Sequence, residues 1–466
     1  MKTVVIIGAG FSGAVTAAQL LRHSPPDVRV VLINRSGAMA RGLAYGTNSP
    51  LHLLNVPAGN MSADIDDPEH FLRFCQVGDA TCTASSFVPR KIYGEYLTSV
   101  LDDAEKHCAH GVRLERIVAE VRRLQPRETG AVVELTNGQC IDADQVVLAF
   151  GNFSPLDPPG FCASMSAERY QSDPWAAGSS PASDPNRAVL LVGAGLTALD
   201  VSLGLLQSGH KGPIYMISRR GLRPLPHRPK RTDDEVSADF AARLLQATPS
   251  VRVYLQLIRR EIKAARKHRL DWRDLVAALR PITPDLWIRL PIAERRRFLR
   301  HLQPYWDVHR HRVAPAAYKR FEEALETGQV RCLAGRIKSV EASVDYLRIR
   351  IQRRNEQVLE EIKAEQVINC TGPTTDLYRV KDPLIQQLCA DGLIQVDTLG
   401  LGLCVNERLA VKSSSGICSS WLYYVGPMLK ADYWEATAVP ELRQYSKKLA
   451  VNLVDRIGRD GVGVSP

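Results

Sequence analysis

The chain has 466 residues, of which 45% are hydrophobic and 24% are charged. This composition is typical of a globular protein of two or three domains. The ten cysteines are scattered, without a C-x-x-C pair or a cluster with histidine, which argues against a dithiol centre and against any metal site. The sequence has no leader pattern and no apolar run of membrane-spanning length, so we expect a cytoplasmic protein.

The net charge of +10 comes from one segment. Residues 259–320 contain 17 Lys and Arg and only 6 Asp and Glu. A solvated helix face explains such a run, and so does a docking surface for an acidic carrier protein that delivers a tethered substrate. Arg295-Arg296-Arg297 has neither interleaved aromatic residues nor a recognisable nucleic-acid-binding module around it, so we expect no nucleic-acid partner.

The first strand and the turn after it carry the main motif. The apolar run 4–7 leads into G-x-G-x-x-G, formed by Gly8, Gly10 and Gly13, and then into a helical stretch that ends near Leu21. A tight turn, close approach of a pyrophosphate and close helix packing each need one of these glycines. We therefore expect a dinucleotide at this turn, with Phe11 and Ser12 beside it, although a plain glycine-rich turn has the same pattern.

The second strand, Val28–Ile33, ends at Asn34, where dinucleotide-binding proteins usually carry an acidic residue. Asparagine can bond ribose hydroxyls without a charge, and Arg35 could meet a phosphate. Residues 41–62 are polar and rich in turn-formers, as in a structured loop against a ligand or a surface connection. Helices are expected from Asp66 and after Arg90, then a hairpin at Asn137-Gly138 and a buried strand that stops at Gly151.

A Pro- and Ser-rich stretch, 153–186, ends the first unit, and the opening pattern then returns. Residues 188–192 lead into a G-x-G-x-x-A turn that contains Gly193, Gly195, Leu196 and Thr197. A hairpin-like region and a strand that ends at Gly372 repeat the earlier order. Two complete copies indicate two bound dinucleotides, one of which passes electrons to the other.

The second strand of this copy, 214–217, ends at Ser218-Arg219-Arg220 instead of an acid. A hydroxyl and two guanidinium groups can bind a 2′-phosphate, so the pattern favours NADPH over NADH. An exposed basic turn is the alternative.

Residues 231–328 have helical patterns and almost no strand pattern. Trp287, Phe298, Tyr305 and Trp306 are expected in a helical core. The cluster Asp307–Arg312 could bind an anionic substrate or the phosphates of the nicotinamide nucleotide. A strand near residues 421–425 then ends at Gly426, and a terminal helix begins near Tyr433, its N-terminus either facing a flavin ring or packing without a ligand.

Several strings resemble the bacterial FAD-NAD(P)-binding protein family along nearly the whole chain: RGLAYGT (41–47), HLLNVPAG (52–59), FVPRKIYGEYL (87–97), VGAGLTALD (192–200), ISRRG (217–221), VINCTGP (367–373) and WEATAVPELR (434–443). The helix starts near 67–71 and 89–97 are also similar to those of flavin-dependent N-hydroxylating monooxygenases.

The resemblance implies an α/β fold of two Rossmann-like dinucleotide-binding modules, glutathione-reductase-like, with a helical insertion in the second. The expected units are an FAD-binding domain (1–155 and 373–466), an NAD(P)-binding domain (186–230 and 329–372) and the insertion (231–328). Arg41, Asn55 and the residues around Gly151-Asn152 are expected to line the flavin. Gly426-Pro427 replaces the usual Gly-Asp, which, with Asn34, implies modest FAD affinity and loss of FAD during purification.

We therefore expect an FAD-dependent, NADPH-reduced oxidoreductase, a monooxygenase that hydroxylates a small amine-bearing substrate. No catalytic side chain is identified, because the cofactors supply the chemistry. Two alternatives remain. One is an NAD(P)H-dependent flavin reductase or dehydrogenase that does not use oxygen productively, and the other is a nucleotide-sensing or carrier-binding protein with vestigial flavin chemistry.

Overall fold

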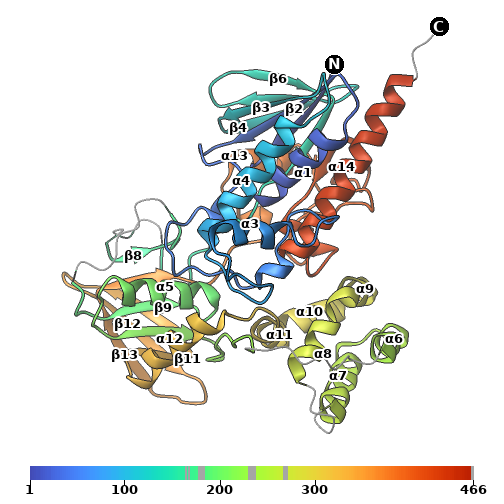
Figure 1. Ribbon diagram of the computed structural model, residues 1–466. Helices are drawn as coiled ribbons and strands as arrows, with labels where there is room; N and C mark the ends of the chain where they lie inside the picture. Colours follow the sequence, from blue (N-terminus) through green and yellow to red (C-terminus); the bar gives the residue numbers. More distant parts are fainter. Residues whose placement is uncertain (163–164, 166–167, 177–183, 229–237, 266–270, 463–466) are drawn as a thin grey trace.

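The computed structural model describes residues 1–162, 165, 168–176, 184–228, 238–265 and 271–462. The Ser179-Ser180-Pro181 part of the predicted boundary and the start of the predicted insertion lie outside these residues. The described chain forms two sheet-based halves and a separate group of helices (Figure 1). The prediction of an α/β fold with two dinucleotide-binding modules is confirmed by two large sheets, each of which contains a set of adjacent parallel strands.

The first sheet has the strand order β15-β16-β7-β1-β2-β3, and all of its strands except β15 are parallel. Its strands are β1 (Lys2–Ile7), β2 (Val28–Asn34), β3 (Arg113–Val118), β7 (Gln145–Leu148), β15 (Ala410–Lys412) and β16 (Cys418–Tyr424). Because β16 pairs with β7, the last part of the chain returns to the sheet formed by the first part.

Helix α1 (Phe11–His23) is the centre of this half. Small side chains such as Ala14 and Ala18 let it pack closely, and every residue from Phe11 to Leu21 is buried. It contacts α4 (Arg90–Lys106) and the terminal helix α14 (Val439–Val462), which runs beside it in Figure 1. The N-terminus of α1 is thereby held rigidly at the carboxyl edge of the sheet.

Smaller elements complete the first half. Helices α2 (Gly42–Tyr45) and α3 (His70–Gly78) follow β2, and a separate antiparallel sheet consists of β4 (Val121–Pro126), β5 (Ala131–Leu135) and β6 (Cys140–Ala143). The predicted Asn137-Gly138 turn connects β5 and β6. Helix α13 (Pro383–Ala390) packs against β4.

The second sheet has the order β13-β12-β11-β10-β9-β14-β8, in which β8 to β11 and β14 run parallel. Its strands are β8 (Tyr170–Gln171), β9 (Val189–Val192), β10 (Ile214–Ser218), β11 (Val330–Ala342), β12 (Leu347–Arg353), β13 (Leu359–Ala364) and β14 (Gln366–Asn369). Helix α5 (Leu196–Gln207) follows β9, just as α1 follows β1. The internal repeat is thus a structural repeat.

The helices between β10 and β11 divide into two groups. The group at the lower right of Figure 1 contains α6 (Ala238–Gln246), α7 (Val251–Ala265), α8 (Trp272–Ala278), α9 (Thr283–Arg289), α10 (Ile292–His301) and α11 (Gln303–Arg310). Helix α12 (Pro315–Glu326) instead packs against α5 and β11 and buries Phe321 in the core of the second sheet. It occupies the crossover between β10 and β11, although its residues fall within the predicted range 231–328.

The predicted aromatic core of the helical group is present. Trp287 is 3% exposed, and its ring lies 4.5 Å from that of Trp434. Its Nε1 donates a hydrogen bond to the carbonyl of Ala431, so the helical group is attached to the segment before α14. Phe298 and Trp306 pack against this cluster, whereas Tyr305 is exposed.

Candidate functional site

One cavity of about 2080 Å³ extends from the N-terminus of α1 to the helical group. Its walls include the residues after β1, the 41–61 loop, the start of α5 and the residues around Arg312. It also touches Asn152 and Pro373. The carboxyl ends of parallel strands are the usual position of ligands in such sheets. The cavity is therefore the candidate site for both dinucleotides.

The first turn has the geometry that a pyrophosphate requires. Gly8 adopts φ +107°, and a Cβ on Gly13 would lie 1.8 Å from the Gly8 carbonyl oxygen. A Cβ on Gly10, by contrast, would meet nothing closer than 3.7 Å. Gly10 is the N-cap of α1 and no side chain caps the helix, so free backbone N–H groups remain available to an anion. These features fit the pyrophosphate of FAD.

Asn34 lines the cavity, but its side chain is engaged in the turn after β2. Its Nδ2 donates to the Ser36 carbonyl at 2.7 Å and to the Ala38 carbonyl at 3.3 Å. Its Oδ1 accepts from Ala9 N at 3.4 Å. The amide therefore organises the loop next to the first turn, and the role of Asn34 at a ribose stays a prediction.

Arg35 also lines the cavity, and its side chain is 66% exposed. Its Nη1 lies 3.6 Å from an Asp382 carboxylate oxygen and 4.0 Å from one of Glu120. Such exposed pairs are weak and exchange readily for another anion. A phosphate contact by Arg35 remains a prediction.

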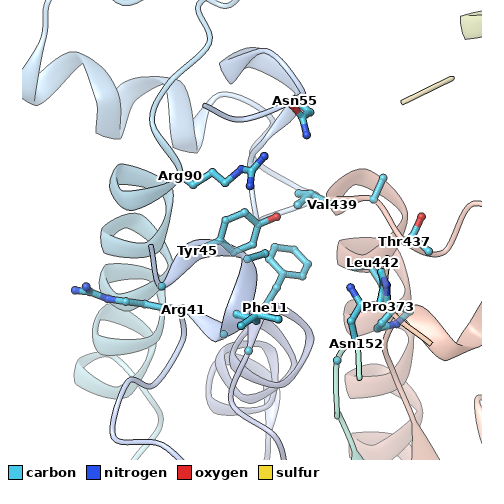
Figure 2. A pocket seen from close by; sticks show the side chains of 18 of the residues that line it. Phe11, Arg41, Tyr45, Asn55, Arg90, Asn152, Pro373, Thr437, Val439 and Leu442 are labelled. Carbon is cyan, nitrogen blue, oxygen red and sulfur yellow. The ribbon is translucent and has the colours of Figure 1, made fainter. Parts of the chain in front are cut away.

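The 41–61 loop supplies one wall of the cavity. Tyr45 packs edge-on against Tyr93 at 4.6 Å, and burial raises the pKa of the Tyr45 phenol to about 12, so it is neutral. Arg41 lines the cavity, and Figure 2 shows its side chain lying across α4 and pointing away from Phe11 and Tyr45. Asn55 contributes its carbonyl, which accepts a hydrogen bond from His227 Nε2 at 2.9 Å.

The opposite wall combines the ends of both halves. Figure 2 shows Asn152, Pro373, Thr437, Val439 and Leu442 across from the loop residues. Gly151 and Gly372 line the cavity with them, whereas Gly426 does not. A Cβ on Gly426 would lie 2.5 Å from Tyr424 Oη, which explains a glycine there by packing. The N-terminus of α14 reaches the cavity through residues 437–439.

The second turn reaches the same cavity through Leu196 and Thr197, the first residues of α5. Gly195 is the uncapped N-cap of this helix, and a Cβ on it would meet nothing within 4 Å. Gly13, Gly193 and Gly195 are not cavity-lining residues themselves. Two uncapped helix N-termini, one in each half, therefore converge on one cavity.

Ser218, Arg219 and Arg220 lie at the end of β10 and do not line the cavity. Ser218 Oγ accepts from Gly221 N, and Arg220 donates to the Arg300 carbonyl at 2.9 Å. Arg219 is exposed and forms no hydrogen bond or ion pair within the described residues. Its guanidinium is accordingly available to a 2′-phosphate, a role that stays a prediction.

Two side chains that the motifs did not reveal connect the halves across the cavity. Arg90 at the start of α4 donates to Asp200 of α5 at 2.8 Å and to the Leu53 carbonyl at 3.0 Å. The side chains of Arg90 and Asp200 are 14% and 9% exposed. Each residue looks like an ordinary helix residue in sequence, and only the tertiary fold pairs them. In the sequence, these two residues are marked only by their place in the strings FVPRKIY and GLTALD, which belong to the family resemblance.

The helical group and the segments that flank it contribute a basic wall. Arg228, Arg273, Arg280, Arg310 and Arg312 all line the cavity. The predicted cluster 307–312 is thus divided: its last three residues face the cavity, and Asp307 does not line it. Within the described chain, no group of three or more His, Cys, Asp and Glu side chains is arranged to hold a metal ion. No described helix is sufficiently long and apolar to span a membrane.

The comparisons with known proteins agree with this geometry. Residues 5–153 match the family described as FAD-NAD(P)-binding. No curated protein matches the chain in sequence. Among solved structures, the ornithine N-hydroxylase of Kutzneria sp. 744, with reduced FAD, NADP⁺ and L-ornithine, is 14% identical with a TM-score of 0.61 and covers 98% of this chain and 99% of that chain.

Two further structures show that the fold is shared by different activities. L-lysine 6-monooxygenase from Pseudomonas syringae is 15% identical, with a TM-score of 0.66 over 98% of this chain and 99% of that one. Bacillithiol disulfide reductase from Staphylococcus aureus is 11% identical, with a TM-score of 0.55 over the same shares of the two chains. Residues 5–153 thus match the FAD-NAD(P)-binding family model, and the chain as a whole shares its fold with these flavin-dependent enzymes.

Proposed function

We propose that the protein is an FAD-dependent oxidoreductase that is reduced by NADPH and uses oxygen to hydroxylate a small amine-bearing substrate. One observation supports the proposal most strongly: the uncapped N-termini of α1 and α5 open into a single cavity. Two dinucleotides held there by their pyrophosphates would share that cavity. A protein that only stores or senses one nucleotide has no need for this arrangement.

Each part of the chain has a task in this proposal. The Gly10 turn holds the FAD pyrophosphate, and the amides of Leu196 and Thr197 hold that of NADPH. The Arg90–Asp200 pair fixes the two helices relative to each other. When bound, FAD supplies the redox chemistry, accepting a hydride from NADPH and delivering electrons to oxygen. The helical group and the 41–61 loop line the cavity in which the two cofactors and the substrate would meet.

An amine substrate is supported by the structural neighbours. These include an ornithine N-hydroxylase, an L-lysine 6-monooxygenase and a cadaverine monooxygenase. The fold alone does not fix the substrate, because a disulfide reductase shares it. A reductase that returns electrons to oxygen unproductively is therefore the second candidate.

Docking of an acidic carrier protein remains a separate prediction. Arg296 and Arg300 are exposed on α10, but Arg295 donates to the carbonyls of Trp287 and Leu290 at the end of α9. Part of the basic run thus has a structural task. The cytoplasmic location likewise stays a prediction.

The test starts with protein reconstituted with FAD. NADPH is added without oxygen, the flavin absorbance is followed, and oxygen is then admitted. Bleaching by NADPH, followed by slow return of the oxidised spectrum and delayed release of hydrogen peroxide, is the expected result. Immediate return with stoichiometric peroxide would support the reductase instead, and no bleaching would refute both enzymatic functions.

A further inference from the structure

The basic wall of the cavity has more positive charge than the described protein neutralises. Four of its five arginines have a carboxylate partner, and three of these pairs are Arg228 with Asp274, Arg273 with Asp271, and Arg280 with Glu441. Arg273 is also fixed by stacking on Trp272 at 4.5 Å and by donation to the Pro226 carbonyl. These three guanidinium groups thus form a rigid frame.

Arg310 is only partly compensated. Its Nη2 lies 3.0 Å from Glu435 Oε2, and the two side chains are 12% and 2% exposed. Burial raises the pKa of Glu435, an effect that the neighbouring Arg310 opposes. The buried Nε of Arg310 makes no hydrogen bond within the described residues. Arg310 therefore lines the cavity with hydrogen-bonding capacity that the described residues leave unused.

Arg312 has no such partner. It is 9% exposed and lines the cavity, and no hydrogen bond or ion pair to it is found in the described part of the chain, its buried Nε included. Burial, with the nearby charges of Arg310 and Arg273, lowers the pKa of its guanidinium to about 10. A buried cation without a partner costs several kcal/mol. Such an arrangement is expected where a ligand completes the pair.

The positive charge of Arg312 also affects a nearby histidine, His227. Burial and then the charge of Arg312 lower the pKa of His227 to about 4, and its Nε2 donates to the Asn55 carbonyl. His227 is thus neutral at physiological pH and adds no competing positive charge. The field at this wall comes from the guanidinium groups.

We propose that Arg312, assisted by Arg310, binds an oxyanion of the substrate, a carboxylate or a phosphate, at the end of the cavity formed by the helical group. This inference rests on the proposed function and specifies its substrate class: the molecule to be oxidised carries negative charge at the end that meets Arg312. Guanidinium groups bind carboxylate and phosphate through paired N–H donors. Arg312 is a binding residue that determines specificity.

The test measures anion binding without NADPH, so that it is independent of the redox reaction. FAD-reconstituted protein is titrated calorimetrically with succinate and, separately, with inorganic phosphate. We expect at least one probe to bind, and Arg312→Gln to weaken it by about tenfold or more. Arg320→Gln, which removes an exposed charge from α12, is the control and should bind like the wild type. The stronger probe identifies which oxyanion is preferred.

A stability measurement provides a second readout. Because Arg312 is buried without a partner, Arg312→Met should melt at a higher temperature than the wild type when no anion is present. The better probe should raise the melting temperature of the wild type but not that of Arg312→Met. This readout also shows that the variant is folded.

Three results would overturn the inference. These are no binding of either probe, equal weakening by Arg312→Gln and Arg320→Gln, and displacement of the bound probe by 2′,5′-ADP. The last would assign the wall to the nicotinamide nucleotide. Failure of NADPH to reduce the flavin would refute the proposed function but would leave the measured anion site intact, so the two failures are distinguishable.

Discussion

At the scale of single residues, some glycines of the two turns are needed for packing, whereas others leave space for a ligand. A Cβ on Gly13 would collide with the Gly8 carbonyl at 1.8 Å, whereas one on Gly10 has no contact closer than 3.7 Å and one on Gly195 has none within 4 Å. Both N-cap residues have negative φ, so alanine fits their backbone. The methyl group would instead occupy the space needed by a pyrophosphate.

We predict that Gly10→Ala folds but loses FAD, and that Gly195→Ala keeps FAD but binds NADPH at least about tenfold more weakly. The absorbance ratio of flavin to protein and a titration with NADPH measure these effects. Gly13→Ala is the matched comparison and should be destabilised by about 1–3 kcal/mol or more. Normal FAD content in Gly10→Ala would show that the pyrophosphate does not lie at this turn.

Arg219 offers a direct test of the nucleotide preference. Arg219→Ala should weaken NADPH binding about tenfold or more while leaving NADH binding nearly unchanged, because only NADPH has a 2′-phosphate. Fluorescence titration with both nucleotides measures the difference, and Arg296→Ala, an exposed charge on α10, is the control. Equal losses for NADPH and NADH would rule out contact with the 2′-phosphate.

His227 predicts a pH dependence of stability. Its pKa is about 4 in the folded protein, below the ordinary value of 6.5, so the unfolded chain binds more protons between these values. The free energy of unfolding should therefore fall as the pH decreases from 6.5 towards 4. His227→Gln should reduce the slope between pH 6.5 and 5 in urea unfolding, whereas the exposed His301→Gln should not. An unchanged slope in His227→Gln contradicts this assignment.

At the scale of elements, the strands, turns and hairpins could be predicted because their signals are local. The strand–turn–helix pattern at residues 4–21 and its repeat at 188–207 follow from glycine spacing and apolar runs. Residues that act through tertiary contacts could not be predicted in this way. Tyr45 reaches the cavity from the short helix α2 and His227 from a loop, and no motif in the sequence identifies either side chain as part of the site.

Asn34 and α12 show the same limit in different ways. The side chain of Asn34 is occupied by the carbonyls of its own loop, which a motif position cannot reveal. Helix α12 has the same helical pattern as α6–α11, yet its apolar face belongs to the core of the second sheet. Helical periodicity shows that a helix exists, but the partner of its apolar face depends on the complete fold.

The contact between α4 and α5 leads to an element-scale prediction. Asp200→Asn would leave the buried Arg90 without its counterion and should lower the free energy of unfolding by about 3 kcal/mol. The double variant Arg90→Met/Asp200→Leu should recover a large part of this loss. Denaturant unfolding measures both, with the exposed Arg127–Asp142 pair as a control worth less than about 1 kcal/mol. A loss no larger than that of the control would show that the pair does not hold the halves together.

At the scale of the whole molecule, the repeated module and the common cavity provide one explanation for the arrangement of the chain. Each half presents an uncapped helix N-terminus, and the helical group adds a basic wall that neither half has by itself. The two helix N-termini would bring the dinucleotides together, and the basic wall would select the substrate. The central claim is that NADPH reduces FAD directly inside this cavity.

The most direct test is the rate of anaerobic flavin reduction by NADPH deuterated at C4 of the nicotinamide, with the 4R and 4S forms compared in a stopped-flow instrument. Direct transfer predicts that one form, and only one, slows flavin bleaching by a primary isotope effect, since a fixed orientation in the cavity exposes one face of the ring. Flavin bleaching with neither form slowed, or no bleaching at all, would contradict the claim.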